Sequence, residues 1–92
     1  MPNCYYVTSS SPGQTAKDLR DCVSEVGGPG RIERPPETDG ATVHSWVKYD
    51  ELGDAIRYLN PIRQCMEGKG HRVHKAKILH QFDEVGLSED GG

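Results

Sequence analysis

The chain begins with a short β pattern that gives way to a helical one. Residues 4–8 are mainly aromatic or β-branched and run into a Ser-Ser-Ser-Pro-Gly turn, so they predict a first strand. From Thr15 onward apolar side chains recur at helical spacing, and Thr15 is the expected N-cap of this helix. The Gly-Gly-Pro-Gly run at 27–30 ends it. The apolar positions of the predicted helix are Ala16, Leu19, Cys22, Val23 and Val26.

A β-hairpin is predicted after this helix. Residues 31–34 form its short first arm, residues 35–40 supply the turn, and residues 41–49 alternate as the second arm. Because strand side chains alternate between faces, residues 41–49 divide into two sets. We expect the first set to be buried against the helices and the second to be mostly solvated. The first set is Ala41, Val43, Val47 and Tyr49, and the second is Thr42, His44, Trp46 and Lys48.

A second helix and a last strand complete the pattern. Asp50 is the expected N-cap of a helix with a clear apolar stripe. Asn60 and Pro61 are expected to interrupt this helix, since proline removes a backbone donor, and to start a further short helix. Residues 71–80 then have the pattern of a last strand.

The order β-α-β-β-α-β indicates an α+β fold of the ferredoxin-like type. Such a fold has a four-stranded antiparallel sheet with two helices on one face. Residues 1–82 are expected to form this single domain, since a chain of 92 residues has room for only one small core. Residues 83–92 carry four acids and no basic residue, and we expect them to be a flexible tail. Partners usually dock on the uncovered face of such a sheet or on its edge strands.

The three cysteines, Cys4, Cys22 and Cys65, are odd in number and form no C-x-x-C pair. This spacing favours neither a disulfide framework nor a zinc site, so we expect three buried free thiols. No apolar run is long enough to cross a membrane, and residues 1–11 lack the charged-then-apolar order of a signal peptide. The expected compartment is therefore the cytoplasm.

Patterns for catalysis and for metal binding are missing from the sequence. His71 and His74 are the nearest approach to a metal pair, but three residues apart on a strand they point to opposite faces. Cys65 with either histidine matches no nucleophile motif, and the glycine-rich runs lack the features of a phosphate loop. The sequence therefore predicts a protein that is not an enzyme and that uses no cofactor, metal or small-molecule substrate.

Charge is distributed unevenly, and this is the strongest functional signal in the chain. The formal net charge is −3, yet residues 57–80 contain six arginines and lysines against the single acid Glu67. A basic stripe of this kind suits a polyanion or an acidic partner. The alternative is structural, because lysines on edge strands also prevent sheets from pairing with one another. The candidate partner-binding residues are Arg57, Arg63, Lys69, His71, Arg72, His74, Lys75 and Lys77.

Aromatic and acidic residues give weaker signals. Tyr5 and Tyr6 alternate on the first predicted strand, so one of them faces away from the helices, and Trp46 belongs to the set predicted to be mostly solvated. Exposed aromatics beside cations suit stacking on bases, although the aromatic motif of RNA-recognition domains is missing. The acids on both predicted helices are interpreted as solvated faces. The alternative, ranked below docking through the basic stripe, is that they imitate DNA phosphates toward a basic partner.

In size, element order and segregation of charge, residues 2–82 resemble the small phage-encoded anti-CRISPR proteins, and among them inhibitors of the type I-F CRISPR surveillance complex. The resemblance implies a stoichiometric, non-catalytic inhibitor that acts in the host cytoplasm. Its partners would be protein subunits of the guide-loaded complex or the guide RNA, at the place where target DNA must enter. The protein itself would be a monomer or a weak homodimer.

Two other classes of function remain open. A regulatory or assembly module would dimerise through its sheet, with exposed Trp46 or Tyr5 as the determinant, and its mass would depend on concentration. A free nucleic-acid-binding protein would bind bare RNA or DNA with an affinity that falls steeply as salt is added.

Overall fold

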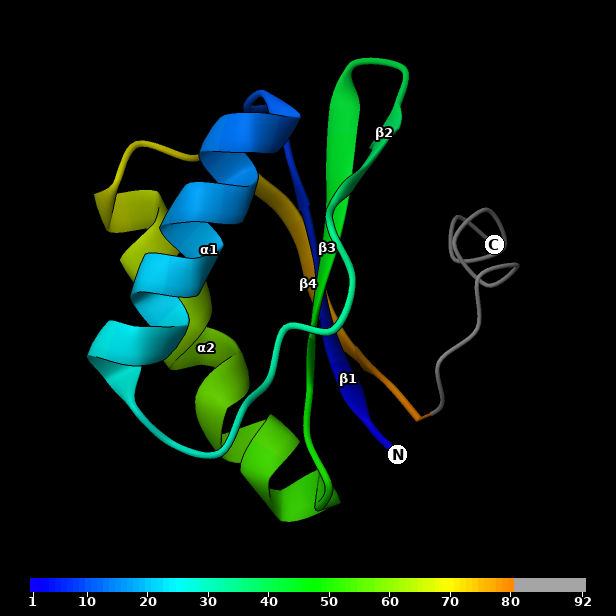
Figure 1. The fold of residues 1–92 in the computed structure, drawn as a ribbon, viewed down its shortest axis with the longest axis vertical. Helices are drawn as coiled ribbons and strands as arrows, with labels where there is room; N and C mark the ends of the chain where they lie inside the picture. Colours follow the sequence, from blue (N-terminus) through cyan, green and yellow to red (C-terminus); the bar gives the residue numbers. More distant parts are fainter. Residues whose placement is uncertain (81–92) are drawn as a thin grey trace.

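The computed structural model describes residues 1–80 (Figure 1). The four strands form one antiparallel sheet in the order β2-β3-β1-β4, so the predicted α+β, ferredoxin-like arrangement is confirmed. The end of the predicted domain and the predicted tail fall in residues 81–92, which lie outside the described residues. The elements are β1 (Asn3–Thr8), α1 (Pro12–Val26), β2 (Glu37–Asp39), β3 (Thr42–Lys48), α2 (Leu52–Gly68) and β4 (Val73–Leu79).

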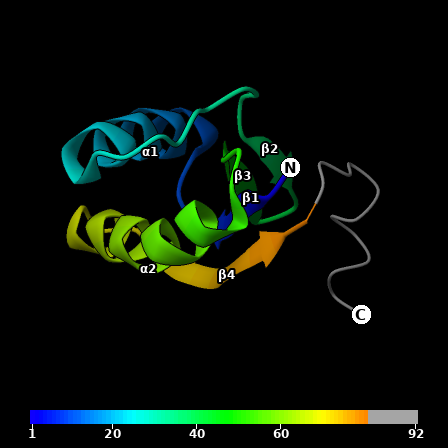
Figure 2. The ribbon, with the colours of Figure 1, turned by 90° about the horizontal axis from the view of Figure 1, so that it is seen from below.

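Strands β1 and β3 occupy the centre of the sheet. Since β1 and β2 are both antiparallel to β3, they are parallel to one another, and α1 connects them across the intervening strand. In the same way α2 connects β3 to β4 across β1. Both helices pack on the same side of the sheet, as the two views in Figure 1 and Figure 2 show. We call the other side, which carries no helix, the open face.

Helix α1 begins earlier than predicted. Its N-cap is Ser11, whose Oγ accepts a hydrogen bond from the Gln14 amide at 3.2 Å, and Pro12 occupies the first turn. Thr15, the predicted cap, is instead buried inside the helix, where its hydroxyl lies 3.1 Å from the hydroxyl of Thr8 on β1. Serine and proline mark turns as well as helix starts, which explains the shift.

The predicted strand at residues 31–34 is wrong. Only Arg31 pairs with the sheet, through two backbone hydrogen bonds of 2.9 and 2.7 Å with Lys48. The two prolines at 35–36 lack the backbone N–H that would extend the ladder. The edge strand β2 lies further along the chain, and a turn at Gly40 joins it to β3.

Helix α2 is continuous, so the predicted interruption at Asn60 and Pro61 is wrong. Pro61 lies inside the helix on its exposed side, where it removes one backbone hydrogen bond. Ala55 before the proline and Ile62 after it are both fully buried. Packing on both sides of Pro61 offsets the lost bond and keeps the helix in one piece.

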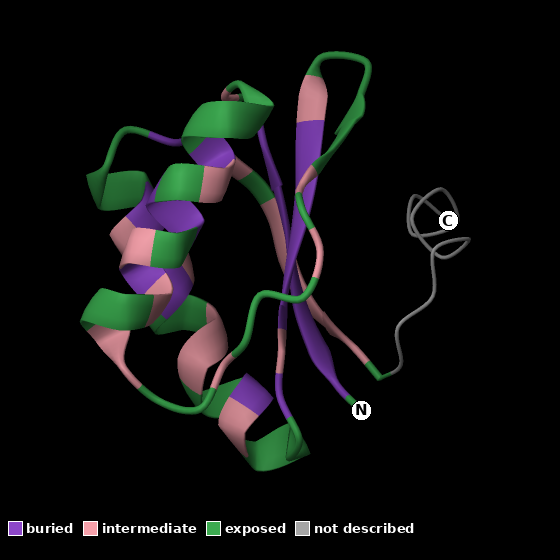
Figure 3. Ribbon diagram, viewed as in Figure 1, coloured by how far each residue is buried: buried purple, intermediate pink, exposed green. Residues whose placement is uncertain are grey.

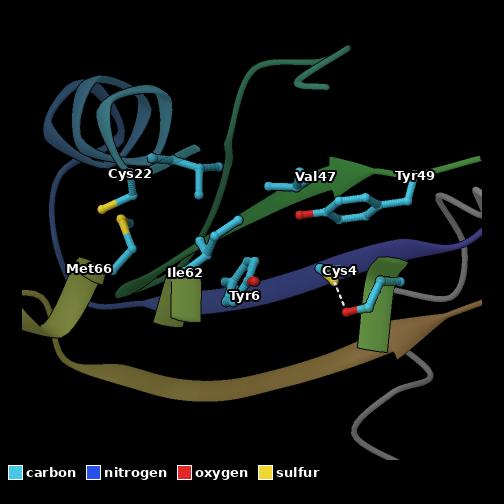
Figure 4. Close-up of a cluster of buried hydrophobic side chains, with 9 residues drawn as sticks. Cys4, Tyr6, Cys22, Val47, Tyr49, Ile62 and Met66 are labelled. Carbon is cyan, nitrogen blue, oxygen red and sulfur yellow. Dashed lines mark hydrogen bonds between the residues drawn. The ribbon is translucent and has the colours of Figure 1, made fainter. Parts of the chain in front are cut away.

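The main core lies between the helices and the sheet (Figure 3). Val47 and Tyr49 are buried there as predicted. Val43 is also buried, as predicted, whereas Ala41 lies in the turn and is exposed. Figure 4 shows side chains from both helices meeting those of β1 and β3. The fully buried members are Cys4, Tyr6, Leu19, Cys22, Val47, Tyr49, Ala55, Ile62 and Met66.

A second, smaller cluster lies on the open face, and it contradicts the expectation of a mostly solvated surface. Trp46 is 3 % exposed and His44 is 7 % exposed. Trp46 packs with Tyr5 and Val7 of β1, and Leu79 of β4 packs against the three of them. The sheet therefore has an apolar cluster on each face.

A disulfide joins the two helices, so the expectation of three free thiols is wrong. Cys22 of α1 and Cys65 of α2 are bonded, with their Cα atoms 5.8 Å apart. They are separated by 43 residues, and only the packing of one helix on the other brings them together. Cys4 is a buried free thiol that donates to the Ala55 carbonyl oxygen at 3.3 Å (Figure 4). Burial raises the pKa of the Cys4 thiol to about 12.

Candidate binding site on the open face of the sheet

The predicted basic stripe does not form one surface. Lys75 and Lys77 lie on the open face, because β4 places them opposite Val7 and Tyr5 of β1. Arg63 belongs to α2, and therefore to the helical layer on the other side of the sheet. The structure brings the two lysines together and separates them from the helical cations.

Two of the predicted cations are already paired with acids. Arg63 donates to the two carboxylate oxygens of Glu67 at 3.2 and 3.3 Å. Lys69 donates to Glu25 on α1 at 2.8 Å. The Glu25 carboxylate raises the pKa of Lys69, because it stabilises the charged ammonium. The first pair lies within α2 and the second joins the end of α2 to α1, and both reduce the charge that the helical layer offers to a partner.

Arg57 and Arg72 are exposed, and in the described part of the chain neither forms an ion pair. Arg72 directly precedes β4, so it lies at the entrance of the strand that carries Lys75 and Lys77. Arg57 lies on α2, in the other layer. Of the predicted cations, Arg72 therefore lies close to Lys75 and Lys77 at β4, and Arg57 lies on the helical side.

The two histidines of the predicted site have different surroundings. His71 is buried, and its Nε2 is hydrogen-bonded to Asp18 at 2.6 Å. It cannot contribute to an exposed binding surface, so this part of the prediction is wrong. His74 is exposed and is hydrogen-bonded to the hydroxyl of Ser9. Hydrogen bonds from Gln14 and His71 hold the pKa of Asp18 below its ordinary value.

A row of aromatic rings lies beside the two lysines. Tyr5 stacks on Trp46 with ring centroids 5.8 Å apart, and on His44 with centroids 5.6 Å apart. Tyr5 lies directly opposite Trp46 on one side and Lys77 on the other. One row of the open face therefore carries an indole, a phenol and an ammonium group. Flat rings beside cations suit nucleic-acid strands. Tyr5 is 1 % exposed and Trp46 is 3 % exposed, so this row presents little open ring surface to a strand.

The loop before β2 contacts one end of the open face. Arg34 places its guanidinium 4.0 Å from the centre of the Trp46 ring. Glu33 accepts hydrogen bonds from Lys48 at 3.1 Å and from Arg31 at 3.3 Å. These two cations, Lys48 the stronger of them, hold the pKa of Glu33 below its ordinary value. The loop is thus fixed to β3 by charge as well as by packing.

Arg31 extends this network to the start of α2. Its guanidinium forms hydrogen bonds of 3.0 and 3.3 Å with the two carboxylate oxygens of Asp50, and it holds the pKa of Asp50 below its ordinary value. Asp50 is therefore not the N-cap that the sequence predicts. Glu51 occupies that position, without a side-chain hydrogen bond to the helix.

A small pocket lies between this loop and the sheet. Its volume is about 210 Å³, and it is lined by Asn3, Glu33, Arg34, Trp46 and Lys48. Asn3 is 2 % exposed, and within residues 1–80 its Nδ2 has no hydrogen-bond partner. A buried amide donor without a partner is uncommon, because removing it from water costs free energy. The pocket therefore combines flat, charged and hydrogen-bonding groups around a small volume.

A larger groove lies between α1 and the same loop. Its volume is about 690 Å³, and Ile32 on its wall is 37 % exposed. The groove is mostly apolar and more than three times as large as the pocket, so it specifies the chemistry of a ligand less closely. Its main apolar residues are Ala16, Leu19, Val23, Ile32, Pro35 and Pro36.

Asn3, Glu33 and Arg34 line the pocket but are not among the residues predicted from the sequence. Glu33 and Arg34 lie in an irregular loop, and no periodic pattern shows that such a loop turns back onto the sheet. Asn3 could have been found, because it lies two residues before Tyr5 on one strand and therefore shares its face.

Within residues 1–80, no three metal-ligating side chains are grouped so that they could hold a metal ion. In the same part of the chain, no helix is long and apolar enough to cross a membrane. No protein-family model matches the chain, and no curated protein matches it.

Proposed function

We propose that this protein is a stoichiometric inhibitor that binds the guide-loaded type I-F CRISPR surveillance complex and blocks the binding of target DNA. The proposal starts from the resemblance to small phage-encoded anti-CRISPR proteins. One observation supports it most directly, namely that Lys75 and Lys77 stand together on the open face beside the aromatic row. The open face of a sheet in this topology is a common docking surface for nucleic acid.

Inhibition of this kind requires only that a site be occupied. In RNA-guided recognition, base pairing reads the sequence, while the protein holds the nucleic-acid backbones through positive charge. A small protein whose cations contact the guide RNA, or an acidic patch beside it, excludes the target strand without breaking any bond. Inhibition should therefore follow the molar ratio of protein to complex.

A native gel tests the proposal. Guide-loaded type I-F complex is incubated with increasing amounts of the protein before labelled target DNA is added. We expect the DNA shift to disappear near molar equivalence and the protein to co-migrate with the complex. An intact shift without co-migration would contradict the proposal. A surveillance complex of another type serves as the specificity control.

A matched pair of variants tests the role of the open face. Lys75→Glu with Lys77→Glu reverses two charges on β4, whereas Lys17→Glu with Arg20→Glu reverses two exposed charges on α1. The two double variants change the net charge equally, so a difference between them reports on position. We expect the β4 variant to need roughly tenfold more protein for inhibition and the α1 variant to match wild type. Equal loss in both would reject the open face as the contact.

The structure counts against dimerisation through exposed aromatics. Tyr5 is 1 % exposed and Trp46 is 3 % exposed, so neither offers an apolar patch to a second copy. Sedimentation at several protein concentrations checks this alternative. Dimerisation through the sheet would be supported if the mass of wild type rises with concentration and the mass of a folded Trp46→Ala variant does not.

A further inference from the structure

We infer that the pocket lined by Asn3, Glu33, Arg34, Trp46 and Lys48 binds a single nucleobase of a single-stranded nucleic acid. The inference deepens the proposed function, and it rests on that function only for the source of the strand, which would be the guide RNA. The chemistry of the pocket belongs to the isolated protein, so it can be tested without the surveillance complex.

The size of the pocket limits what it can hold. Its volume of about 210 Å³ lies below the range of about 300–1,000 Å³ that is typical of sites for drug-sized ligands. One planar ring system fits such a volume, whereas a helix or an extended peptide does not. The pocket therefore favours a small flat group that is presented at the end of a larger molecule.

The walls of the pocket suit a flat ring. The Arg34 guanidinium lies 4.0 Å from the centre of the Trp46 ring, and both groups line the pocket. Bases in single strands stack on aromatic rings and on arginine planes. Trp46 is 3 % exposed and the guanidinium covers its ring, so the flat surface open to a base is the Arg34 plane, whose side chain is 14 % exposed. The Trp46 ring supports that plane, and the Tyr5 ring, with centroids 5.8 Å apart, supports Trp46 before a ligand arrives. Preorganisation of this kind reduces the entropy cost of binding.

The polar groups of the pocket suit the edge of a base. Asn3 has a buried Nδ2 donor, and no residue in the described part of the chain accepts its hydrogen bond. A ring nitrogen or carbonyl oxygen of a base would satisfy it. Glu33 is a carboxylate that can accept a further hydrogen bond from an exocyclic amino group. Adenine presents an acceptor and an amino donor side by side, which is the pattern that these two residues complement.

Lysine side chains on the open face suit the phosphate groups of the rest of the strand. Lys77 lies across β1 from Trp46, two strand spacings away, which is about 10 Å. Within the pocket itself Lys48 is paired with Glu33, and Arg34 is paired with Glu37 on the neighbouring strand. A base alone therefore gains little from charge, whereas a strand that continues along the open face also meets the ammonium groups of Lys77 and Lys75 on β4.

The fluorescence of Trp46, the one tryptophan of the chain, reports on the pocket directly. The probes are AMP, ribose 5-phosphate, which has no base, and an oligoadenylate of about eight nucleotides. We expect saturable quenching by AMP, none by ribose 5-phosphate, and an affinity for the oligoadenylate roughly tenfold or more above that for AMP at low salt. The corresponding oligouridylate should bind more weakly than the oligoadenylate.

A pair of variants separates base recognition from a structural role. Asn3→Leu removes a buried donor that has no partner within residues 1–80, so the melting temperature should stay the same or rise, while the affinity for AMP falls about tenfold. Ser45→Ala is the matched control. It removes a buried hydroxyl that also has no partner among residues 1–80, but on the face that the helices cover, and it should leave the affinity for AMP unchanged. Arg34→Lys keeps the charge, loses the flat plane and should weaken AMP binding.

Three results would overturn the inference. The first is equal quenching by ribose 5-phosphate and AMP, and the second is equal AMP affinity in a stably folded Asn3→Leu variant and in wild type. The third is an affinity for the oligoadenylate no higher than that for AMP, which would assign the pocket to a free nucleotide. Base binding by the isolated protein together with a negative native gel would reject the CRISPR target and leave the pocket assignment supported.

Discussion

His71 Nε2 lies 2.6 Å from Asp18 Oδ2, although the two residues are 53 positions apart and both side chains are almost completely buried. The contact ties the segment that enters β4 to the middle of α1. Gln14 donates a second hydrogen bond to the same carboxylate oxygen at 2.7 Å. A carboxylate that accepts two hydrogen bonds in a buried place is favoured in its ionised form.

We predict that the protein loses stability when Asp18 is protonated. Hydrogen bonds from Gln14 and His71 hold its pKa below the ordinary value of 3.8. A group with a lowered folded-state pKa contributes stability above its unfolded pKa, and this contribution is lost as pH falls through the folded value. Urea midpoints should therefore drop below about pH 4, and Asp18→Asn should flatten the drop. Asp21→Asn, on the same helix, is the control. A drop of equal size in wild type and Asp18→Asn would contradict the assignment.

The disulfide between Cys22 and Cys65 should contribute about 4 kcal/mol to the free energy of unfolding. The bond closes a loop across 43 residues and so restricts the unfolded chain. Reductant should lower the unfolding free energy of wild type by this amount and leave the Cys22→Ser/Cys65→Ser variant unchanged. Urea unfolding of both proteins, with and without reductant, measures the effect. An equal response in the two proteins would show that the bond does not stabilise the fold.

The same bond sets a condition on the proposed function. Disulfides are rarely maintained in the cytoplasm, where the expected target acts. The reduced protein must then stay folded through other contacts between its layers, such as the 2.8 Å ion pair of Lys69 with Glu25. We expect the Cys22→Ser/Cys65→Ser variant to abolish the DNA shift at the same molar ratio as wild type. A folded variant that leaves the shift intact would contradict action in a reducing compartment.

Hydrophobic period predicts the two helices and the strands β1, β3 and β4, but not β2, whose residues Glu37–Asp39 are all exposed. The errors come from places where tertiary packing outweighs a local signal. Ile32 sits in a segment that resembles a strand, but the prolines that follow it cannot extend a ladder. Pro61 resembles a helix break, but the buried side chains on both sides of it keep α2 continuous.

The sequence predicts the binding site less completely than it predicts the fold. Alternation correctly places Lys75 and Lys77 on one face. A count of charges does not show which cations meet acids in space, and so it includes Lys69, which binds Glu25, and His71, which is buried against Asp18. Pairing across 44 or 53 positions depends on the packing of the helices, which no local pattern encodes.

Gly28 and Gly53 should respond in opposite directions to replacement by alanine. Gly28 has a φ of +89°, and a Cβ there would lie 2.5 Å from the Tyr58 ring, which stacks on Tyr49. Gly53 lies in the first turn of α2 with no atom within 4 Å of such a Cβ. Gly28→Ala should cost about 1 kcal/mol or more of unfolding free energy, and Gly53→Ala should add about 0.5 kcal/mol. Urea unfolding measures both, and stabilisation by Gly28→Ala would show that the loop can move away from Tyr58.

Tyr6 and Tyr49 should differ in their response to loss of the phenolic oxygen. Both are fully buried, and burial raises the pKa of each phenol. The Tyr6 hydroxyl donates to the Leu59 carbonyl oxygen at 2.9 Å, whereas within residues 1–80 the Tyr49 hydroxyl has no hydrogen-bond partner. Tyr6→Phe removes a made bond and should lower the unfolding free energy by about 1 kcal/mol. Tyr49→Phe removes a desolvated group without a partner, so it should be neutral or raise the unfolding free energy by up to about 1 kcal/mol.

Chemical unfolding of the two phenylalanine variants, followed by the fluorescence of Trp46, measures this difference. The two substitutions remove the same atom from the same core, so cavity size and lost apolar contacts cancel in the comparison of Tyr6 with Tyr49. The sign of the difference therefore depends on whether a hydrogen bond was present. Equal destabilisation by both variants would mean that the Tyr49 hydroxyl forms a hydrogen bond in solution. Its partner would then lie close to Gly30, where an added Cβ would be 2.9 Å from the Tyr49 hydroxyl oxygen.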